Sequence, residues 1–211
     1  MGFAVNNKRT LLLSLLVLLL LASPLIDDQG DGAVWLTGVF TMVLVAGILA
    51  VGHVRRDLII LLGLAIPWLY MTWLHPAWSG STLDEVASLF LAITTLYIAA
   101  MLLLSVVMAE TVTRDVIGGA IAVYLLLGIA WAVIYALIEG LNPGSFAVAD
   151  ASRGTVWDQL LYFSFATLTT LGYGDISPLT PVARIWAVFE AICGTFFLAI
   201  LISRLVGLYK P

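Results

Sequence analysis

The sequence predicts an all-α membrane protein, with six transmembrane helices and a short re-entrant helix and loop between the fifth and the sixth. Hydrophobic residues make up 62% of the 211 residues, charged residues only 10%, and the mean hydropathy is +1.10. A soluble domain has about half apolar and about a quarter charged residues, so this chain has too few charges to cover a water-soluble globule. A soluble enzyme, a nucleic-acid-binding protein and a disordered chain are therefore excluded as descriptions of the whole protein.

Six apolar runs account for the transmembrane helices, since a helix needs about 20 residues to cross the hydrocarbon core. Their unbroken apolar character excludes a membrane β-barrel, whose strands alternate. The first run follows Lys8 and Arg9 and contains Pro24, a pattern that a signal peptide partly shares. Proline at that point is unfavourable for cleavage, so we expect a retained first helix. The runs are Thr10–Ile26, Ala33–Val51, Leu58–Leu74, Val86–Ala109, Val116–Ile138 and Val182–Leu208.

The basic residues predict the orientation, because lysine and arginine concentrate in cytoplasmic loops. With the amino terminus inside, only Arg153 and Arg184 of the nine basic residues fall outside. The seven tryptophans then fall in the outer halves of the runs or in outer loops, as an interfacial belt does. We therefore expect a multi-pass protein of the plasma (inner) membrane, surrounded by lipid, with both termini in the cytoplasm.

The segment between the fifth and sixth runs has a different pattern. It opens with the turn Asn142-Pro143-Gly144 and continues to Thr155 and Asp158, which have the spacing of a capping box. A helix from there to Leu168 has about 13 residues and reaches only about 20 Å, too short to cross the bilayer. The chain must enter and return. Non-helical backbone at membrane depth is tolerated where it lines water, so we expect the next residues to line an aqueous path.

Those next residues, 169–175, read Thr-Thr-Leu-Gly-Tyr-Gly-Asp. This loop resembles the selectivity filter of the tetrameric potassium channel family. In that family two helices flank a short re-entrant helix and such a loop, and the resemblance extends over about Val116–Leu208. It implies a potassium-selective channel in which K+ is the permeant ion and no further cofactor is bound. It also implies a homotetramer, because one chain supplies one of the four strands that surround the ion.

The physical role of the loop follows from the chemistry of K+. Carbonyl oxygens must replace the water of the ion. The resemblance implies that Thr170, Leu171, Gly172, Tyr173 and Gly174 form the ion sites, with the Thr170 hydroxyl at the innermost one. An ordinary strand alternates its carbonyl groups. Glycines at 172 and 174 allow the positive φ values that turn successive carbonyls toward one axis.

Neighbouring residues are expected to support the filter. Thr169 and Asp175 flank it, the Tyr162 hydroxyl is placed to bond Asp175 from behind, and the Tyr173 side chain should point away from the axis and brace the loop. The sequence also departs from the family pattern. Leu171 replaces the usual valine, and we expect selectivity to survive because the carbonyl is the ligand. The short helix has Tyr162 and Phe163 in place of two tryptophans, and Ala166 in place of a glutamate found in some members.

The sixth run contains three further candidates. Glu190 is the one acid well inside a run, and an intramembrane carboxylate is a functional hypothesis by default. It is expected either to support the filter by bracing the loop or the short helix, or to reach water behind the pore. Gly194 and Gly207 are candidate hinges, with close helix packing as the alternative.

The first four runs predict a separate unit, residues 1–110, followed by a pore domain, residues 111–211. The layout resembles that of voltage-gated potassium channels, but Val86–Ala109 contains no lysine, arginine or histidine. Voltage sensors carry their arginines in that helix, so steep voltage gating is not expected. We expect a lipid-facing scaffold, with a degenerate sensor for a lipid or small ligand as the alternative.

Two other functions remain open from the sequence. Residues 172–175 also match the Gly-x-Gly-Asp pattern of intramembrane aspartyl proteases. That chemistry requires a second aspartate in the same site, and Asp57 and Asp115 are predicted at inner helix ends, opposite Asp175. We therefore expect no enzyme. A non-conducting membrane scaffold is the third possibility.

Overall fold

The computed structural model describes residues 6–23, 31–52, 55–74, 82–148 and 155–208. Seven helices and one two-stranded antiparallel sheet form within these ranges. The elements are α1 (Asn6–Ala22), α2 (Asp31–Val51), α3 (Arg55–Leu74), α4 (Thr82–Val107), α5 (Arg114–Leu141), β1 (Phe146–Val148), α6 (Val156–Leu168), β2 (Ile176–Pro178) and α7 (Pro181–Leu208).

Each of the six apolar runs forms a helix, and α6 is the short helix expected between the last two. α1 ends at Ala22, and Pro24 and the rest of its predicted run lie outside the described residues. Among the described residues, four helical segments are long and apolar enough to cross a membrane, and the apolar helix Thr37–Val51 is shorter. The four are Arg55–Trp73, Glu85–Val107, Arg114–Leu141 and Pro181–Arg204.

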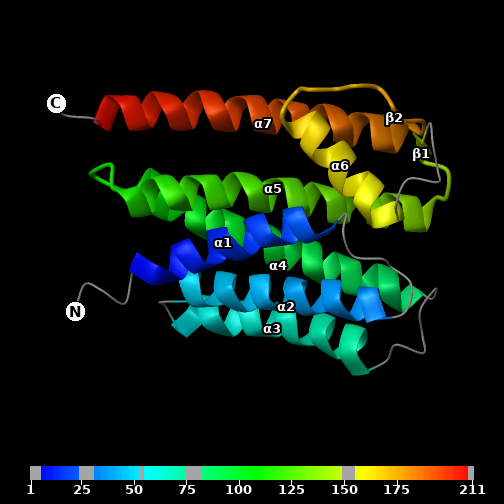
Figure 1. Ribbon diagram of the computed structural model, residues 1–211, viewed down its shortest axis with the longest axis horizontal. Coiled ribbons are helices and arrows are strands. Elements are labelled where there is room, and N and C mark those ends of the chain that lie inside the picture. Colours follow the sequence, from blue (N-terminus) through cyan, green and yellow to red (C-terminus); the bar gives the residue numbers. More distant parts are fainter. Residues whose placement is uncertain (1–5, 24–30, 53–54, 75–81, 149–154, 209–211) are drawn as a thin grey trace.

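The helices are arranged around α5 (Figure 1). α6 and α7 lie on one side of it, α1 and α4 pack on the other, and α2 and α3 lie farthest away. The first turn of α1 and the last turn of α7 are at the same end of the bundle, and β1 and β2 are at the opposite end. α6 is inclined between α5 and α7, so it holds the loop that follows it beside α7.

One continuous apolar core joins α1 to α6. Each of the first five helices contributes fully or almost fully buried side chains to it, among them Leu12, Leu44, Leu61, Ile98 and Leu126. The predicted boundary at residues 110 and 111 falls in the loop between α4 and α5, and the core continues across it. α1 and α4 thus support α5 directly, and α5 in turn supports α6.

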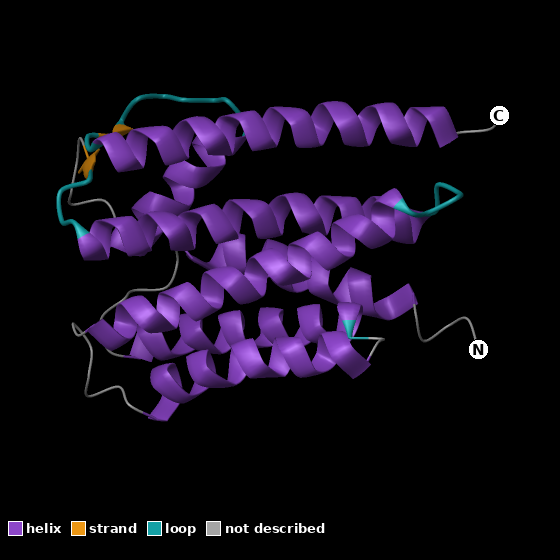
Figure 2. Cartoon of the chain, turned by 180° about the vertical axis from the view of Figure 1, so that it is seen from behind, coloured by secondary structure: helices purple, strands orange, loops and turns teal. Residues whose placement is uncertain are grey.

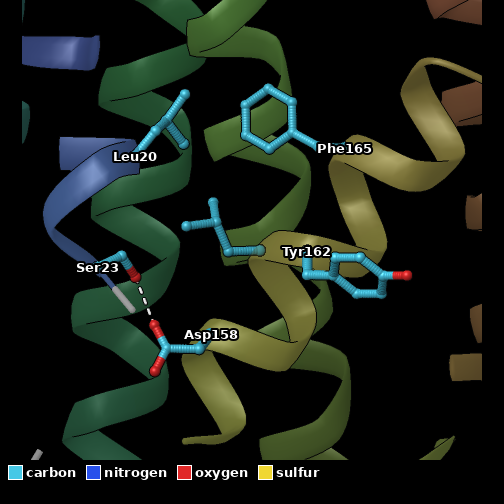
Figure 3. Close-up of a pocket in the computed structure, with 6 residues that line it drawn as sticks. Leu20, Ser23, Asp158, Tyr162 and Phe165 are labelled. Carbon is cyan, nitrogen blue, oxygen red and sulfur yellow. Dashed lines mark hydrogen bonds between the residues drawn. The ribbon is translucent and has the colours of Figure 1, made fainter. Parts of the chain in front are cut away.

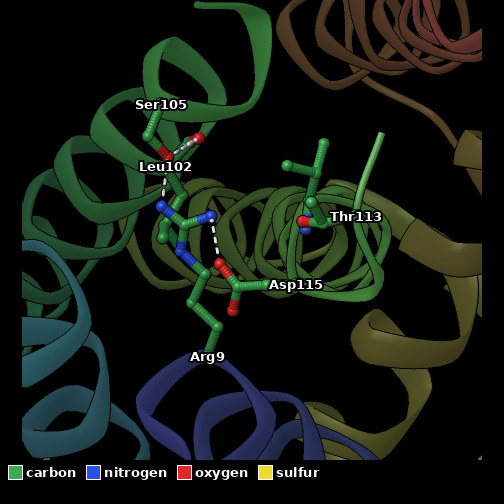
Figure 4. Close-up of polar contacts among 6 residues, drawn as sticks. Arg9, Leu102, Ser105, Thr113 and Asp115 are labelled. Atoms are coloured by element: carbon green, nitrogen blue, oxygen red, sulfur yellow. Dashed lines mark hydrogen bonds and ion pairs between the residues drawn. The ribbon is translucent and has the colours of Figure 1, made fainter. Parts of the chain in front are cut away.

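Arg9 ties three helices together at the end of the bundle where α1 begins (Figure 4). Its Nη1 lies 2.8 Å from Asp115 Oδ2 on α5, and its Nη2 donates to Ser105 Oγ on α4 at 3.2 Å. The adjacent start of α5 is capped by Thr113, whose hydroxyl oxygen accepts from the Val116 backbone N–H at 3.2 Å. These contacts fix α1 and α4 against the start of α5.

The predicted capping box starts α6 as expected. The Thr155 hydroxyl oxygen accepts from the Asp158 backbone N–H at 3.1 Å, and the Asp158 carboxylate accepts from the Thr155 backbone N–H at 3.3 Å. Donors left unpaired in the first helical turn are thereby satisfied. The helix ends after 13 residues, as its sequence predicts.

The all-α prediction omitted one small sheet. β1 and β2 pair antiparallel, with Ala147 opposite Ser177. The Glu139 carboxylate, near the end of α5, accepts from the backbone N–H groups of Gly144 at 2.7 Å and Phe146 at 3.2 Å, which fixes the turn that leads into β1. Each strand has three residues, too few for an alternating pattern to indicate it in the sequence. The sheet joins the chain before α6 to the chain after the loop.

Candidate functional site

The loop of residues 169–175 leaves the carboxyl end of α6 and leads into β2. Figure 2 shows it running beside α7, at the edge of the molecule farthest from α2 and α3. All seven residues are exposed in the single chain. The loop therefore faces an open side of the molecule.

Three residues of the loop have positive φ. The predicted values at the two glycines are confirmed, with φ of 55° at Gly172 and 81° at Gly174. Thr170 also has a positive φ, 60°, which the sequence did not predict because threonine is β-branched and resists this region. Such outliers gather where a surrounding structure requires them for function.

The start of the loop is anchored to the last turn of α6. The Thr169 hydroxyl donates to the Phe165 carbonyl oxygen at 2.6 Å. The backbone N–H groups of Leu171 and Gly172 both point back to the Ala166 carbonyl oxygen, at 2.8 and 3.1 Å. Thr169 is thus part of the anchor, and α6 and the beginning of the loop form one hydrogen-bonded unit.

The outer end of the loop is held through Asp175. The predicted bond from Tyr162 is present, with its hydroxyl donating to Asp175 Oδ1 at 3.2 Å. The same oxygen accepts from the Ile176 backbone N–H, also at 3.2 Å. The Tyr173 side chain is 71% exposed in the single chain, so its expected bracing role stays a prediction.

Glu190 lies in a buried polar cluster between three helices. Its Oε2 accepts from the Tyr135 hydroxyl of α5 at 2.5 Å, and its Oε1 lies 2.6 Å from Ser164 Oγ of α6. The side chain of Glu190 has no exposed surface. Of the two sequence alternatives, the structure therefore places Glu190 against the short helix and not in water. Ser164 and Tyr135 were not singled out in the sequence, because each looks like an ordinary polar residue of an apolar helix.

The two candidate hinge glycines have different surroundings. A Cβ at Gly194 would lie 2.2 Å from the Leu168 carbonyl oxygen, so the close-packing alternative describes this position. A Cβ at Gly207 would meet nothing within 4 Å. A third glycine, Gly128 of α5, was missed, and its absent side chain makes room for the Phe165 ring of α6. α6 is thus packed against glycines on both of its neighbours.

A pocket of about 370 Å³ lies behind α6, beside the end of α1 (Figure 3). Ser23 points toward Asp158 and donates a hydrogen bond to its carboxylate. The capping carboxylate of α6 is therefore also the point at which α1 reaches the short helix. The pocket is lined by Leu20, Ser23, Asp158, Leu161, Tyr162 and Phe165.

The carboxylates that a protease requires are not brought together. Asp57 is at the start of α3, where its Oδ1 accepts from the Tyr97 hydroxyl at 3.1 Å. Asp115 is at the start of α5 and pairs with Arg9. Both helix starts lie at the opposite end of the bundle from β2, which follows Asp175 directly (Figure 1).

Comparisons with known proteins connect this region to channels. Residues 120–210 match the sequence model of a family described as ion channel. The chain is 37% identical over 84 residues to two pore potassium channel c of Oryza sativa subsp. japonica, covering 40% of this chain and 17% of that protein. It is 39% identical over 101 residues to two-pore potassium channel 5 of Arabidopsis thaliana, covering 46% and 22%.

A viral protein is matched over most of its length. The chain is 27% identical over 78 residues to potassium channel protein kcv of Paramecium bursaria Chlorella virus 1, covering 37% of this chain and 82% of that protein. The chain spans less than a quarter of the length of the two plant relatives. No solved structure matches the chain significantly. These similarities connect this chain with ion channels and not with enzymes.

Proposed function

We propose that the protein is a potassium-selective channel that conducts K+ passively through a homotetrameric pore. The loop at residues 169–175 carries the proposal. It follows a short helix, is exposed on an open edge of the molecule and has positive φ at Gly172 and Gly174. Its sequence lies within the segment that matches the ion-channel family, and the relatives above are named potassium channels.

In this proposal the loop is the selectivity filter. The carbonyl oxygens of Thr170, Leu171, Gly172 and Tyr173 replace the hydration shell of K+, and Gly174 completes the outer end. The carboxyl end of α6 directs the negative end of its helix dipole toward the ion. No covalent chemistry occurs, and the only group that the protein binds in this function is the ion that passes.

The apolar surface that one chain leaves exposed supports a homotetramer. α7 exposes large apolar side chains along most of its length, and the loop lies beside it. Four copies placed around the loop would cover part of this surface and would also cover the exposed Tyr173 side chain. α7 then lines the pore, and α1 to α4 lie outward as a lipid-facing scaffold. Residues 1–110 and 111–211 act as scaffold and pore domain.

The membrane arrangement combines six crossings with α6 as a re-entrant helix. In this arrangement α1 and α2 cross the membrane, as do the four helices that are long and apolar enough to span it. Arg9, Arg114 and Arg204 lie at the end of the bundle that contains the start of α1 and the end of α7. By the distribution of basic residues this end is cytoplasmic, and the membrane is the plasma (inner) membrane.

The decisive experiment is K+ flux into liposomes that contain the purified protein, with barium as a blocker. We expect K+ flux that exceeds Na+ flux, and particles with four copies of the chain. Gly172→Val should abolish selective flux while the assembly persists, because φ is positive there and nothing lies within 4 Å of an added Cβ.

The matched control is Gly144→Val. Gly144 also has a positive φ, 84°, and equally open surroundings, but it lies in the turn after α5. It should lose some stability and keep its selectivity. K+-selective flux through the Gly172→Val protein would overturn the filter assignment. Absence of any K+ flux from the wild-type protein would favour a non-conducting scaffold.

A further inference from the structure

The cluster around Glu190 contains two contacts that compete for one proton. Ser164 Oγ lies 2.6 Å from Glu190 Oε1 and 2.7 Å from the Gly128 carbonyl oxygen of α5. Both distances are those of O–H···O hydrogen bonds. A serine hydroxyl has one proton to donate. It therefore cannot donate to the carboxyl group and to the carbonyl group at the same time.

The identity of the acceptors decides where the second proton is. The Gly128 carbonyl oxygen can only accept, so its contact with Ser164 uses the serine proton. The contact between Ser164 and Glu190 then needs a proton on Glu190 Oε1. The remaining oxygen, Oε2, accepts from the Tyr135 hydroxyl at 2.5 Å. With one proton on Oε1, each of the three contacts has one donor and one acceptor. Tyr135 donates to Glu190, Glu190 donates to Ser164, and Ser164 donates to the Gly128 carbonyl oxygen.

The surroundings of Glu190 agree with a neutral group. Tyr135, Ser164 and Glu190 all have 0% exposed surface. Among the described residues, the salt bridges are Arg9 with Asp115 and Arg56 with Asp57, so no cation pairs with Glu190. In the described part of the chain, Tyr135 and Tyr124 of α5 are the titratable groups that interact with Glu190, and Ser164 is its hydrogen-bond partner on α6. A buried carboxylate without a cation is costly.

We propose that Glu190 is protonated in the working protein and acts as a positioning residue: it donates to Ser164, accepts from Tyr135 and so joins α7 to α6 and α5. The functional part of this proposal rests on the channel function proposed above. The last turn of α6 anchors the loop through Thr169 and Ala166. A fixed contact between α6 and α7 therefore sets the position of the loop relative to the helix proposed to line the pore, and a neutral carboxyl does so without placing a charge near the ion.

The protonation state can be measured without any flux. The chain has only four glutamates, so protein labelled with 13C at glutamate Cδ and reconstituted in lipid vesicles gives few carboxyl signals in solid-state NMR. The signal that disappears in Glu190→Gln should have the chemical shift of a protonated carboxyl at pH 7. Glu110→Gln is the matched control, since Glu110 is exposed in the loop after α4 and its substitution should leave the protonated signal in place.

A carboxylate shift for Glu190 at pH 7 would overturn the proposal. If Glu190→Gln does not fold, single substitutions of the other three glutamates assign the Glu190 signal by elimination. This measurement is independent of conduction. Failure of the wild-type protein to pass K+ would therefore remove the proposed function and leave the protonation result standing.

The positioning role is tested by two substitutions that separate length from charge. Glutamine keeps the length and is neutral, accepting from Tyr135 and donating to Ser164, so Glu190→Gln should keep K+ flux and selectivity within about twofold. Aspartate keeps the ability to ionise but is one methylene shorter and cannot span both partners, so Glu190→Asp should reduce selective flux about tenfold. The reverse order, with aspartate tolerated and glutamine not, would show that a charge is required and would overturn the proposal.

Discussion

α5 and α7 are alike in sequence and different in their surroundings. Each has 28 residues, and the mean hydropathy of their membrane segments is 2.5 and 2.3. Both pack against α6. Yet 61% of the residues in the most apolar 18-residue segment of α5 are buried within the chain, compared with 17% in that of α7. Hydropathy identifies both as helices that can cross a membrane but does not distinguish a helix packed by its own chain from one that is left open.

The contacts of α7 explain why so little of this helix is buried. Its fully or nearly buried residues, Ala183, Glu190 and Gly194, are spaced seven and four apart and therefore form one stripe. The fully buried part of this stripe contains a carboxyl group and a glycine, not large apolar side chains. Phe197 and Leu201 continue the stripe and are partly buried against the core, while most other large apolar residues of α7 are exposed. α7 is thus held by specific contacts along a narrow line, and its apolar faces are available to lipid and to copies of the chain.

The strongest test of this comparison is an extra methyl group on the narrow line. In Gly194→Ala the new Cβ would lie 2.2 Å from the Leu168 carbonyl oxygen, a backbone atom at the end of α6. α7 must then move away from α6. Overpacking of this kind lowers the free energy of unfolding by about 1–3 kcal/mol, occasionally more. We expect a lower thermal unfolding midpoint in detergent and loss of most K+ flux.

The control for that substitution is on the same helix. Gly207→Ala adds the same methyl group where nothing lies within 4 Å, and it should leave both the midpoint and the flux unchanged. If the two variants behave alike, α7 is not held along the stripe that contains Gly194. A hinge at Gly194 would instead show as altered gating in a protein whose thermal midpoint is that of the wild type.

A smaller effect is expected where the loop on the open side is held by single hydrogen bonds. Tyr162→Phe removes the bond to Asp175 and leaves the ring in place. A bond of this kind contributes about 0.5–1.5 kcal/mol, so the ratio of K+ to Na+ permeability should fall by about tenfold or less. Bi-ionic reversal potentials measure this ratio.

Tyr97→Phe is the matched control for the tyrosine. It removes one hydroxyl bond, to Asp57, within the packed region of α3 and α4. Selectivity should be that of the wild type in this variant. An equal fall in both variants would mean that the loop responds to the stability of the whole bundle and not to the contact at Asp175.

Some parts of the molecule can be predicted from the sequence and others cannot. The helices, the capping box and the positive φ values at Gly172 and Gly174 follow from local rules, which act within a few residues. The partners of Glu190 lie 26 and 55 residues away in the chain, on helices whose rotation no local pattern determines. The close approach of Gly194 to Leu168 depends likewise on how two helices pack. Contacts between helices therefore had to come from the structure.

The smallest expected effect is that of voltage on the open probability. It depends on whether charged residues can move α7 relative to α5. α4 packs on α5, but the described part of the chain places no cation on α4, and its sequence contains none. Moving one elementary charge through the membrane field contributes about 2.3 kcal/mol per 100 mV, and steep gating uses roughly three to four such charges in each of four subunits. The basic residues that border this region, Arg9 and Arg114, lie at helix starts at the end of the bundle.

Glu190 is the one acid within α7, and a protonated carboxyl carries no charge through the field. We therefore expect the open probability of the purified channel to change only shallowly with voltage, with an apparent gating valence below about one charge in place of the twelve or more of steep gating. Voltage steps across planar bilayers in symmetric K+ measure this valence. A valence of several charges would contradict the prediction, and it would require the movement of basic residues that the structure places near the ends of helices.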